Sequence, residues 1–357
     1  MPETQTILAP AVPVERPQAT RIGQLDGIRT VAFLMVFVDH LHGVPLLWMG
    51  VDIFFVLSGF LITGILLRSR PERAGRYFGR FYARRARRIL VPYGAALLLS
   101  SLFFGWGWER YWYWYVFYGV NIGIALGQMG HASLSVLWSL GVEEQYYLFW
   151  PLVVRKHSEK ALLWGSVATI ALCPILRAAI TPLHLTGDPI AFIRFLTPFR
   201  MDTLCAGAVL AILWRRRGDA GFTAWVPVAR AALLGTMALV LYLAKFHGLR
   251  VVNDTPFSNA FIYSAGVVMA AALLVMALGN DRIVCPVLRL PAMRYLGVIS
   301  YTMYLVHFTF LYAVREHIAS KWWAGVVALG LTVAFASASW FGYEKRMLKP
   351  RRRHAQA

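Results

Sequence analysis

Charged residues are scarce in this chain of 357 residues. Asp, Glu, Lys and Arg make up 15% of it, whereas a soluble domain of ordinary composition carries about a quarter. Hydrophobic residues reach 58% and aromatic residues 14%. Apolar runs long enough to cross a hydrocarbon core of ~30 Å recur along the whole sequence. This composition argues against a soluble protein and predicts an all-α, polytopic membrane helix bundle.

Cysteines and acidic residues are also few. The three cysteines are far apart and form no Cys-x-x-Cys pair, which argues against a disulfide framework and a zinc site, so no metal is expected. Asp and Glu number 17 against 36 Lys and Arg, giving a net charge of +19. The basic residues gather in particular loops, which the positive-inside rule explains better than nucleic-acid binding does. No nucleic-acid partner is therefore expected.

Ten segments are predicted to span the membrane, with both termini in the cytoplasm. The cytoplasmic segments then hold about 26 of the basic residues, as the positive-inside rule requires. The aromatic-rich segment 107–127 is ambiguous, so the count is 10–11; making it a span would put the arginines at 215–217 outside. We therefore place it at the outer face. The ten segments are 28–46, 50–67, 89–106, 136–154, 161–180, 201–214, 227–244, 258–278, 295–314 and 323–343.

The two ends of the chain differ from the rest in composition. Residues 1–25 are polar and lack the basic start and apolar core of a signal peptide, so they are predicted to form a disordered cytoplasmic tail. Residues 347–357 are predicted to form a basic cytoplasmic tail. The membrane domain is expected between them, at 26–346, and no loop is long enough to fold as a second domain.

The first predicted span carries ionisable residues on one stripe. On an α-helix, Arg29 and His40 lie within about 20° of each other, and Asp26 lies one turn from Arg29. Asp39 points about 100° away from His40, and His42 is nearer the membrane surface. Ionisable side chains inside a membrane are costly and usually functional, which makes His40 a candidate catalytic residue.

Two further stretches contain candidate binding or catalytic residues. Residues 76–93 contain six arginines, which fit either a positive-inside signal at the lipid surface or the binding of a phosphate-bearing ligand. In residues 137–151, Ser139, Glu143 and Tyr147 share one helix face, and Glu144 points elsewhere. We expect Glu143 to pair with an arginine or to hold a catalytic group. In residues 50–67, small residues predict close helix packing.

Seven stretches together make the chain resemble the acyltransferase 3 family of bacterial integral-membrane O-acyltransferases. The resemblance runs over residues 24–346 and departs from the family pattern in two places. In the third stretch a Val intervenes before the Pro. In the last stretch the Pro that commonly follows soon after the Glu is missing. The stretches, in order, are LDGIRTVAFLMVFVDH, GVDIFFVLSGFLIT, FYARRARRILVPY, LWSLGVEEQYYLFWP, FRMDTLCAGAVLAIL, GVISYTMYLVHF and YEKR.

The resemblance implies transfer of an acyl group, often acetyl, from cytoplasmic acyl-CoA to a hydroxyl of a carbohydrate-type acceptor. Acyl-CoA would be a co-substrate, with no tightly bound cofactor, and the protein would lie in the bacterial inner membrane as a module without the extra soluble domain of many relatives. His40 would act as general base or transient acyl carrier. Arg85 and Arg88 would handle the donor, and Asp26, Arg29 and Glu143 would line the path and orient those groups. Together with the residues singled out above, the expected catalytic set is His40, Glu143, Asp26 and Arg29. The expected substrate-binding set is Arg84, Arg85, Arg88, Ser58, Ser139 and Tyr147.

Two other classes of protein share some of these features. The membrane-bound O-acyltransferase superfamily also uses a buried histidine, but it does not explain the ordered stretches at 24–67 and 76–151. A transporter or flippase of an acylated or glycosylated metabolite would suit a helix bundle with a polar stripe, although no symmetry of interrupted helices is evident. The sequence leaves open the acceptor, the acyl chain length and the oligomeric state.

Overall fold

A computed structural model describes residues 22–183, 189–249 and 255–347. Within these ranges the chain forms helices and no strand, which confirms the predicted all-α bundle. Most of both predicted tails lies outside the described residues. The first helix begins at Gly23, three residues before the predicted start of the membrane domain.

Nine long helices build the bundle: α1 (Gly23–His42), α2 (Gly50–Ser69), α3 (Ala74–Phe104), α6 (Leu137–Lys156), α7 (Glu159–Ile180), α9 (Met201–Phe246), α10 (Pro256–Leu278), α12 (Pro291–Arg315) and α13 (Lys321–Ser339) within the described ranges. Shorter helical pieces connect them: η1 (Leu47–Met49), η2 (Glu109–Tyr111), α4 (Trp112–Val116), α5 (Val120–Ala125), η3 (Ala132–Leu134), η4 (Thr181–Leu183), α8 (Pro189–Phe195), η5 (Thr197–Phe199), α11 (Val284–Leu288), the π-helical turn η6 (Trp340–Glu344) and α14 (Lys345–Met347).

Each predicted span overlaps one of these helices, although the spans 28–46, 89–106 and 323–343 run past the ends of α1, α3 and α13. Seven helices of the described chain are long and apolar enough to cross a membrane. Two more, α1 and α6, have 20 residues each, which is sufficient for ~30 Å, but both carry ionisable side chains. The predicted spans 201–214 and 227–244 share α9, which bends sharply at Gly218, where φ is 63° and ψ is −165°. The protein is thus a multi-pass membrane protein, and the count of ten remains a prediction.

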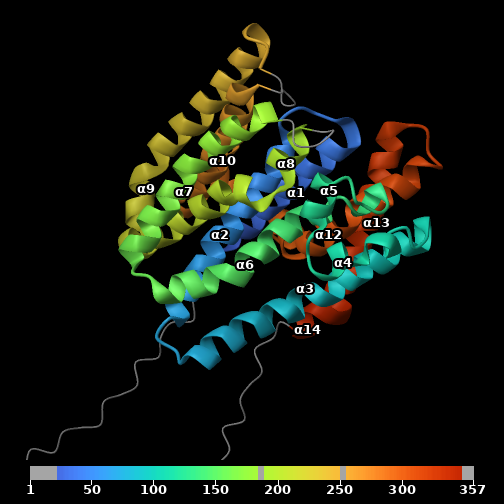
Figure 1. Cartoon of the computed structure of the whole chain (residues 1–357), viewed down its shortest axis with the longest axis horizontal. Helices are drawn as coiled ribbons and strands as arrows, with labels where there is room; N and C mark the ends of the chain where they lie inside the picture. The colour runs from blue at the N-terminus through green and yellow to red at the C-terminus, as the bar shows by residue number, and fades with distance from the viewer. Residues whose placement is uncertain (1–21, 184–188, 250–254, 348–357) are drawn as a thin grey trace, which may run out of the picture.

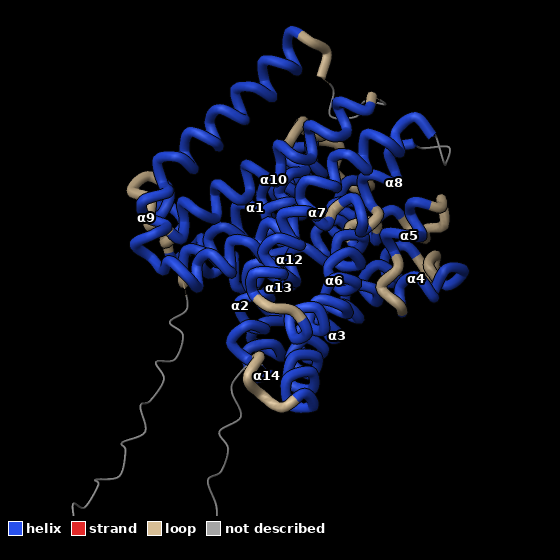
Figure 2. The backbone as a smooth tube through the Cα atoms, turned by 60° about the vertical axis from the view of Figure 1, so that its left-hand side comes forward, coloured by secondary structure: helices blue, strands red, loops and turns tan. Residues whose placement is uncertain are grey.

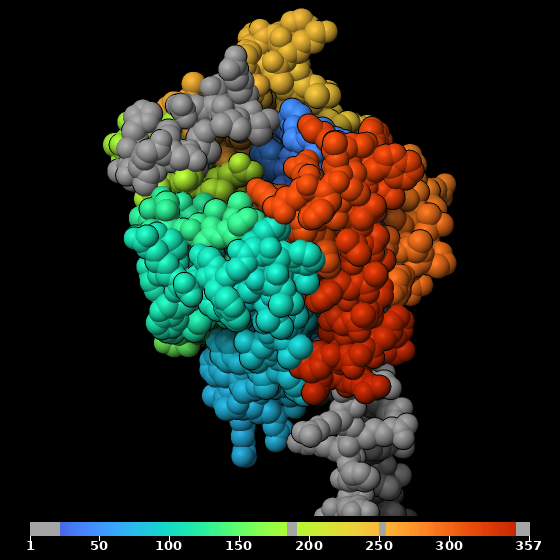
Figure 3. Space-filling view, turned by 90° about the vertical axis from the view of Figure 1, so that its right-hand side faces the viewer, coloured from blue at the N-terminus to red at the C-terminus, as the bar shows by residue number. Residues whose placement is uncertain are grey.

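The aromatic-rich segment 107–127 does not form a spanning helix. It folds into η2, α4 and α5, of which the longest has six residues. A helix needs about 20 residues to cross the hydrocarbon core. Figure 3 shows this turquoise part of the chain on one face of the molecule, beside the red C-terminal helices.

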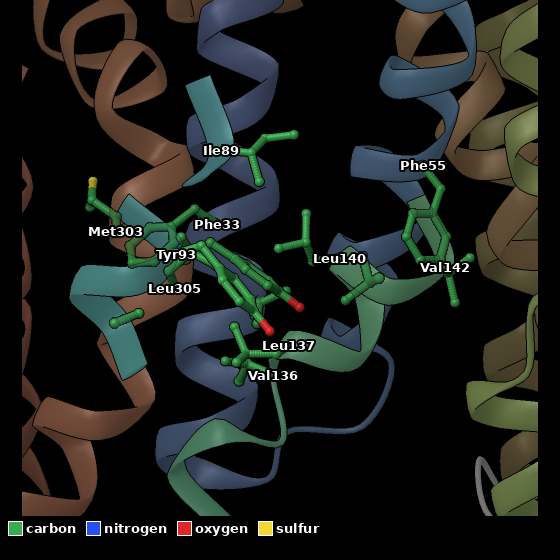
Figure 4. Packing of buried hydrophobic residues seen from close by; sticks show 14 of the residues in the cluster. Phe33, Phe55, Ile89, Tyr93, Val136, Leu137, Leu140, Val142, Met303 and Leu305 are labelled. Carbon is green, nitrogen blue, oxygen red and sulfur yellow. The ribbon is translucent and has the colours of Figure 1, made fainter. Parts of the chain in front are cut away.

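Helices α1 and α2 lie between two groups of helices (Figures 1 and 2). The larger buried apolar cluster joins α1 and α2 to α3, α6, α12 and α13, and a second joins them to α9 and α10. Figure 4 shows Phe33 of α1, Tyr93 of α3, Leu137 of α6 and Leu305 of α12 converging in the larger cluster. Large apolar side chains on α7, α9 and α13 face outward, as lipid-exposed surfaces require.

Both ends of the described chain leave the bundle at the same end. Gly23, at the start of α1, lies against the side chain of Arg294 near the start of α12. The hydroxyl of Tyr295 donates to Ser337 Oγ at 2.7 Å, which brings the end of α13 to the same place. We call this the inner end. The opposite, outer end is where Arg315 donates to the carbonyl of Leu41. Placement of the inner end in the cytoplasm remains a prediction.

Small residues let α2 and α9 approach until their backbones touch. A Cβ on Gly59 would lie 2.0 Å from the carbonyl oxygen of Leu204, and one on Gly207 would lie 2.1 Å from that of Val56. A neighbouring backbone cannot move aside as a flexible side chain does. The small residues predicted to permit close packing therefore do so at Gly59.

Substituting Gly59 by alanine should destabilise the bundle. The added methyl group would force α2 and α9 apart at a cost of about 1–3 kcal/mol, the usual penalty for overpacking. Thermal unfolding of the purified protein in detergent measures this as a lower Tm. Gly64→Ala is the matched control, because its Cβ would meet only the end of Arg68, at 3.7 Å. Equal melting of the two variants would contradict the prediction.

Candidate active site

Two histidines from opposite ends of the sequence meet near the outer end of the bundle. His40 lies in the last turn of α1, and its Nδ1 is 2.9 Å from Nε2 of His307 on α12. The ring planes differ by 2° and the ring centroids are 5.1 Å apart. Such a centroid separation with so short an N–N distance requires the rings to meet edge to edge in one plane. This is the geometry of a well-aligned hydrogen bond.

Aromatic rings hold this histidine pair. His307 is fully buried, with the ring of Phe33 edge-on at 5.6 Å. Phe308 stacks on His40 with its centroid at 4.3 Å. The Nδ1 of His307 is 2.7 Å from the carbonyl oxygen of Tyr304, one turn earlier on α12. His40 is therefore fixed on one edge and one face, and the residue as a whole is half-buried.

His40 lines a small pocket at the outer end. The pocket has a volume of about 20 Å³, which is room for one water molecule or one hydroxyl group. Of its two arginines, Arg200 is buried and bonds to the buried carboxylate of Asp52, whereas Arg194 makes no ion pair with any residue the structure describes. The lining residues are Asp39, His40, Trp48, Val51, Trp138, Arg194, Arg200, Tyr263 and Tyr304.

A second polar cluster lies toward the inner end. The guanidinium of Arg85 packs over the ring of Tyr147 at 3.8 Å and interacts electrostatically with Glu143 and Glu144. The hydroxyl of Ser58 donates to Glu143 Oε1. Glu143 thus lies within electrostatic reach of Arg85, but it forms none of the ion pairs of the described residues, so its pairing with an arginine stays a prediction. Glu144, expected to point elsewhere, also interacts electrostatically with Arg85.

Arginines gather at the inner side of this cluster. Arg88 lies within electrostatic reach of both Arg29 and Arg85. Arg29 forms an ion pair with Asp26 at 2.9 Å, as their spacing of three residues predicts. Concentrated guanidinium groups suit the phosphates of a ligand, since arginine binds phosphate oxygens in pairs.

The two clusters belong to one polar seam through the bundle. The hydroxyl of Tyr304 is 2.7 Å from Ser139 Oγ, which lies one turn from Glu143 on α6. Along α1, Arg29 and His40 are eleven residues apart, or roughly 16 Å. The seam therefore runs from arginines at the inner end to a histidine beside a hydroxyl-sized pocket at the outer end.

The structure gathers nine of the ten predicted site residues along this seam. Arg84 is the exception, since its side chain is exposed and its Nε donates to the carbonyl of Arg80 on its own helix. Asp39, expected to be solvated, is half-buried in the pocket wall. Sequence reasoning missed His307, Arg194 and Arg200. For His307 a signal existed, because it is an ionisable residue inside an apolar run, the same feature that pointed to His40.

The chain is similar to curated bacterial proteins named O-acetyltransferases. YrhL of Bacillus subtilis, provisionally named a peptidoglycan O-acetyltransferase, is 28% identical over 90% of this chain and 54% of its own length. OatA of Listeria monocytogenes, a peptidoglycan O-acetyltransferase, is 26% identical over 89% of this chain and 54% of its own length. The chain thus spans about half the length of these curated relatives. No solved structure matches it.

The family comparison covers the whole described bundle except its last turns. A family model described as an acyltransferase domain matches residues 22–341, from the start of α1 to the π-helical turn after α13. This range contains both histidines, the arginine cluster and the pocket. The chain belongs to the acyltransferase 3 family.

Proposed function

We propose that this protein moves an acetyl group from cytoplasmic acetyl-CoA to a hydroxyl group of a carbohydrate acceptor, within the bacterial inner membrane. The observation that carries the proposal is the seam: Arg85 and Arg88 stand toward its inner end, and His40 faces a pocket at its outer end. A donor rich in phosphate would approach the seam from its inner end, and an acceptor presenting a hydroxyl would approach it from its outer end.

His40 would activate the hydroxyl group of the acceptor. His40 takes the proton of the acceptor hydroxyl as its oxygen attacks the thioester carbonyl carbon. The C–S bond then breaks, and the CoA thiolate leaves and takes the proton held by His40, so that an ester, free CoA and neutral His40 result. General base catalysis of this kind contributes about 10²–10⁴ to the rate. His40 could instead carry the acetyl group transiently, in which case an acetylated protein accumulates when the acceptor is withheld.

The arginines supply donor binding. Arg85 and Arg88 would bind the phosphates of CoA through charge-assisted hydrogen bonds, which are about twice as strong as neutral ones. Glu143 would orient Arg85, with Ser58 and Tyr147 fixing both groups. The acyl group, at the end of the long pantetheine arm, would extend along the seam toward His40. Ser139 lines the middle of that path through its contact with Tyr304.

The pocket limits what reaches the histidine. A volume of about 20 Å³ admits a hydroxyl group and excludes a sugar ring. The acceptor ring would therefore lie outside the pocket, near the aromatic side chains of Trp48 and Trp138. Both relatives named above carry peptidoglycan in their names, so a glycan of the cell envelope is the acceptor class we propose.

Purified protein in liposomes, supplied with radiolabelled acetyl-CoA and peptidoglycan oligosaccharides, tests this proposal. We expect release of free CoA and label bound covalently to the glycan as an alkali-labile ester. Uptake of oligosaccharide into the liposomes without covalent label would contradict transfer and support the transporter alternative. Label retained on the protein without acceptor, and lost in a His40→Ala variant, would identify the carrier mechanism.

A further inference from the structure

We propose that His307 is a positioning residue that decides which nitrogen of His40 carries the proton. The inference rests on the proposed function, because it concerns His40 as the group that receives the acceptor proton. It assigns a role to a residue of α12 separated from His40 by 267 positions in the sequence.

The hydrogen bonds of His307 determine its own proton first. Its Nδ1 lies 2.7 Å from the carbonyl oxygen of Tyr304. A carbonyl oxygen only accepts hydrogen bonds, so Nδ1 of His307 must carry the hydrogen. In a neutral imidazole the other nitrogen then has none. The Nε2 of His307 is therefore an acceptor.

The proton of His40 follows from that. Its Nδ1 is 2.9 Å from Nε2 of His307, and one of these two nitrogens must donate. Since Nε2 of His307 is the acceptor, Nδ1 of His40 is the donor. The Nε2 of His40 is left with a free lone pair, on the edge of the ring away from His307. Because His40 lines the pocket and its Nδ1 is engaged by His307, Nε2 is the nitrogen left to accept from a hydroxyl there.

The arrangement also serves the protonated intermediate. When Nε2 of His40 takes a proton, the ring becomes a cation that still donates from Nδ1 to the neutral His307. The hydrogen on Nδ1 of His307 stays in place, since the Tyr304 carbonyl cannot accept it as a proton. His307 thus accepts a hydrogen bond from the charged His40 ring while it keeps its own hydrogen on Nδ1. Its burial beside Phe33 keeps the acceptor nitrogen in position.

Three substitutions separate this role from mere packing. In His307→Gln, the amide oxygen can occupy the place of Nε2 and accept from His40. In His307→Asn the amide is equally polar but one carbon shorter, so it can reach the Tyr304 carbonyl and not His40. His307→Leu fills the space and offers no acceptor. Each is measured as the full chain in liposomes, for kcat and for KM of both substrates.

We expect His307→Gln to keep kcat within about tenfold of the original protein. His307→Asn and His307→Leu should lose about 10²–10⁴-fold in kcat with unchanged KM values, because a catalytic histidine in the wrong tautomer is ineffective. Equal kcat in the Asn and Gln variants, or full activity in the Leu variant, would overturn the proposal. If the Leu variant does not fold, the comparison of Asn with Gln still decides, with Tm measured for both.

A measurement of the tautomer keeps this inference separate from the proposed function. In protein labelled with ¹⁵N-histidine, we expect the neutral His40 ring to carry hydrogen on Nδ1, with its signals assigned by His40→Gln. In His307→Leu it should revert to hydrogen on Nε2. Hydrogen on Nε2 of His40 in the original protein would overturn the role of His307 whether or not the protein transfers acetyl groups. Absence of transfer with the expected tautomer would overturn only the proposed function.

Discussion

Replacing His40 by alanine is expected to lower acyl transfer by about 10²–10⁴-fold while the protein stays folded and inserted. The substitution removes the imidazole that lines the pocket at the outer end of the seam, and with it the proposed general base. Binding of the donor should persist, because the arginines stand toward the inner end. Transfer of labelled acetyl to the glycan, measured at saturating acetyl-CoA, gives the size of the loss.

His42→Ala is the matched control for this loss. His42 ends the same helix, but its side chain is exposed and lies beside Trp322 rather than in the pocket. We expect its transfer rate to equal that of the unsubstituted protein. Retained transfer in His40→Ala, with this control also active, would remove His40 from the mechanism.

Arg88→Met should raise KM for acetyl-CoA by about 10–100-fold with a much smaller effect on kcat. A hydrogen bond to a charged group contributes about 1.5–3 kcal/mol, and each 1.4 kcal/mol corresponds to a tenfold change in affinity. A short acetyl thioester without phosphates offers an internal check. With that donor, the variant and the unsubstituted protein should perform equally.

Arg84→Met controls for the charge of the membrane surface. Arg84 lies on the same helix, four residues earlier, but its exposed side chain bonds only to its own helix. Its KM for acetyl-CoA should stay unchanged. An equal rise in KM for both variants would show that surface charge, and not a phosphate site at Arg88, attracts the donor.

Hydropathy and charge predicted where the long helices lie, but they did not determine how many separate helices there are. Hydropathy located all the long helices, because each must bury about 20 residues in lipid whatever its partners are. It could not show that the predicted spans 201–214 and 227–244 belong to one helix bent at Gly218. It also left 107–127 undecided, since aromatic residues suit both a span and an interface.

Contacts within one helix of the site could be predicted from the sequence, whereas contacts between helices could not. Helical periodicity correctly placed Asp26 beside Arg29, because both residues lie on one helix. Arg84 belongs to the same arginine-rich stretch and falls within about 40° of Arg88 on an α-helix, so the sequence does not distinguish them. The structure does, because the side chain of Arg84 is exposed. The contacts of His40 with His307 and of Asp52 with Arg200 join distant segments. No local pattern specifies such a pair.

The distance in sequence between the two histidines has a consequence for biosynthesis. Translation at about 5–20 residues per second means that His307 is made roughly 13–53 s after His40. During this interval α1, which is not among the helices apolar enough to qualify as a span, lacks its partner α12. Helix α2, the next to emerge, is among the helices long and apolar enough to cross a membrane, and it packs on α1 in the folded protein. The site that performs the chemistry is thus completed only when the penultimate long helix enters the bilayer.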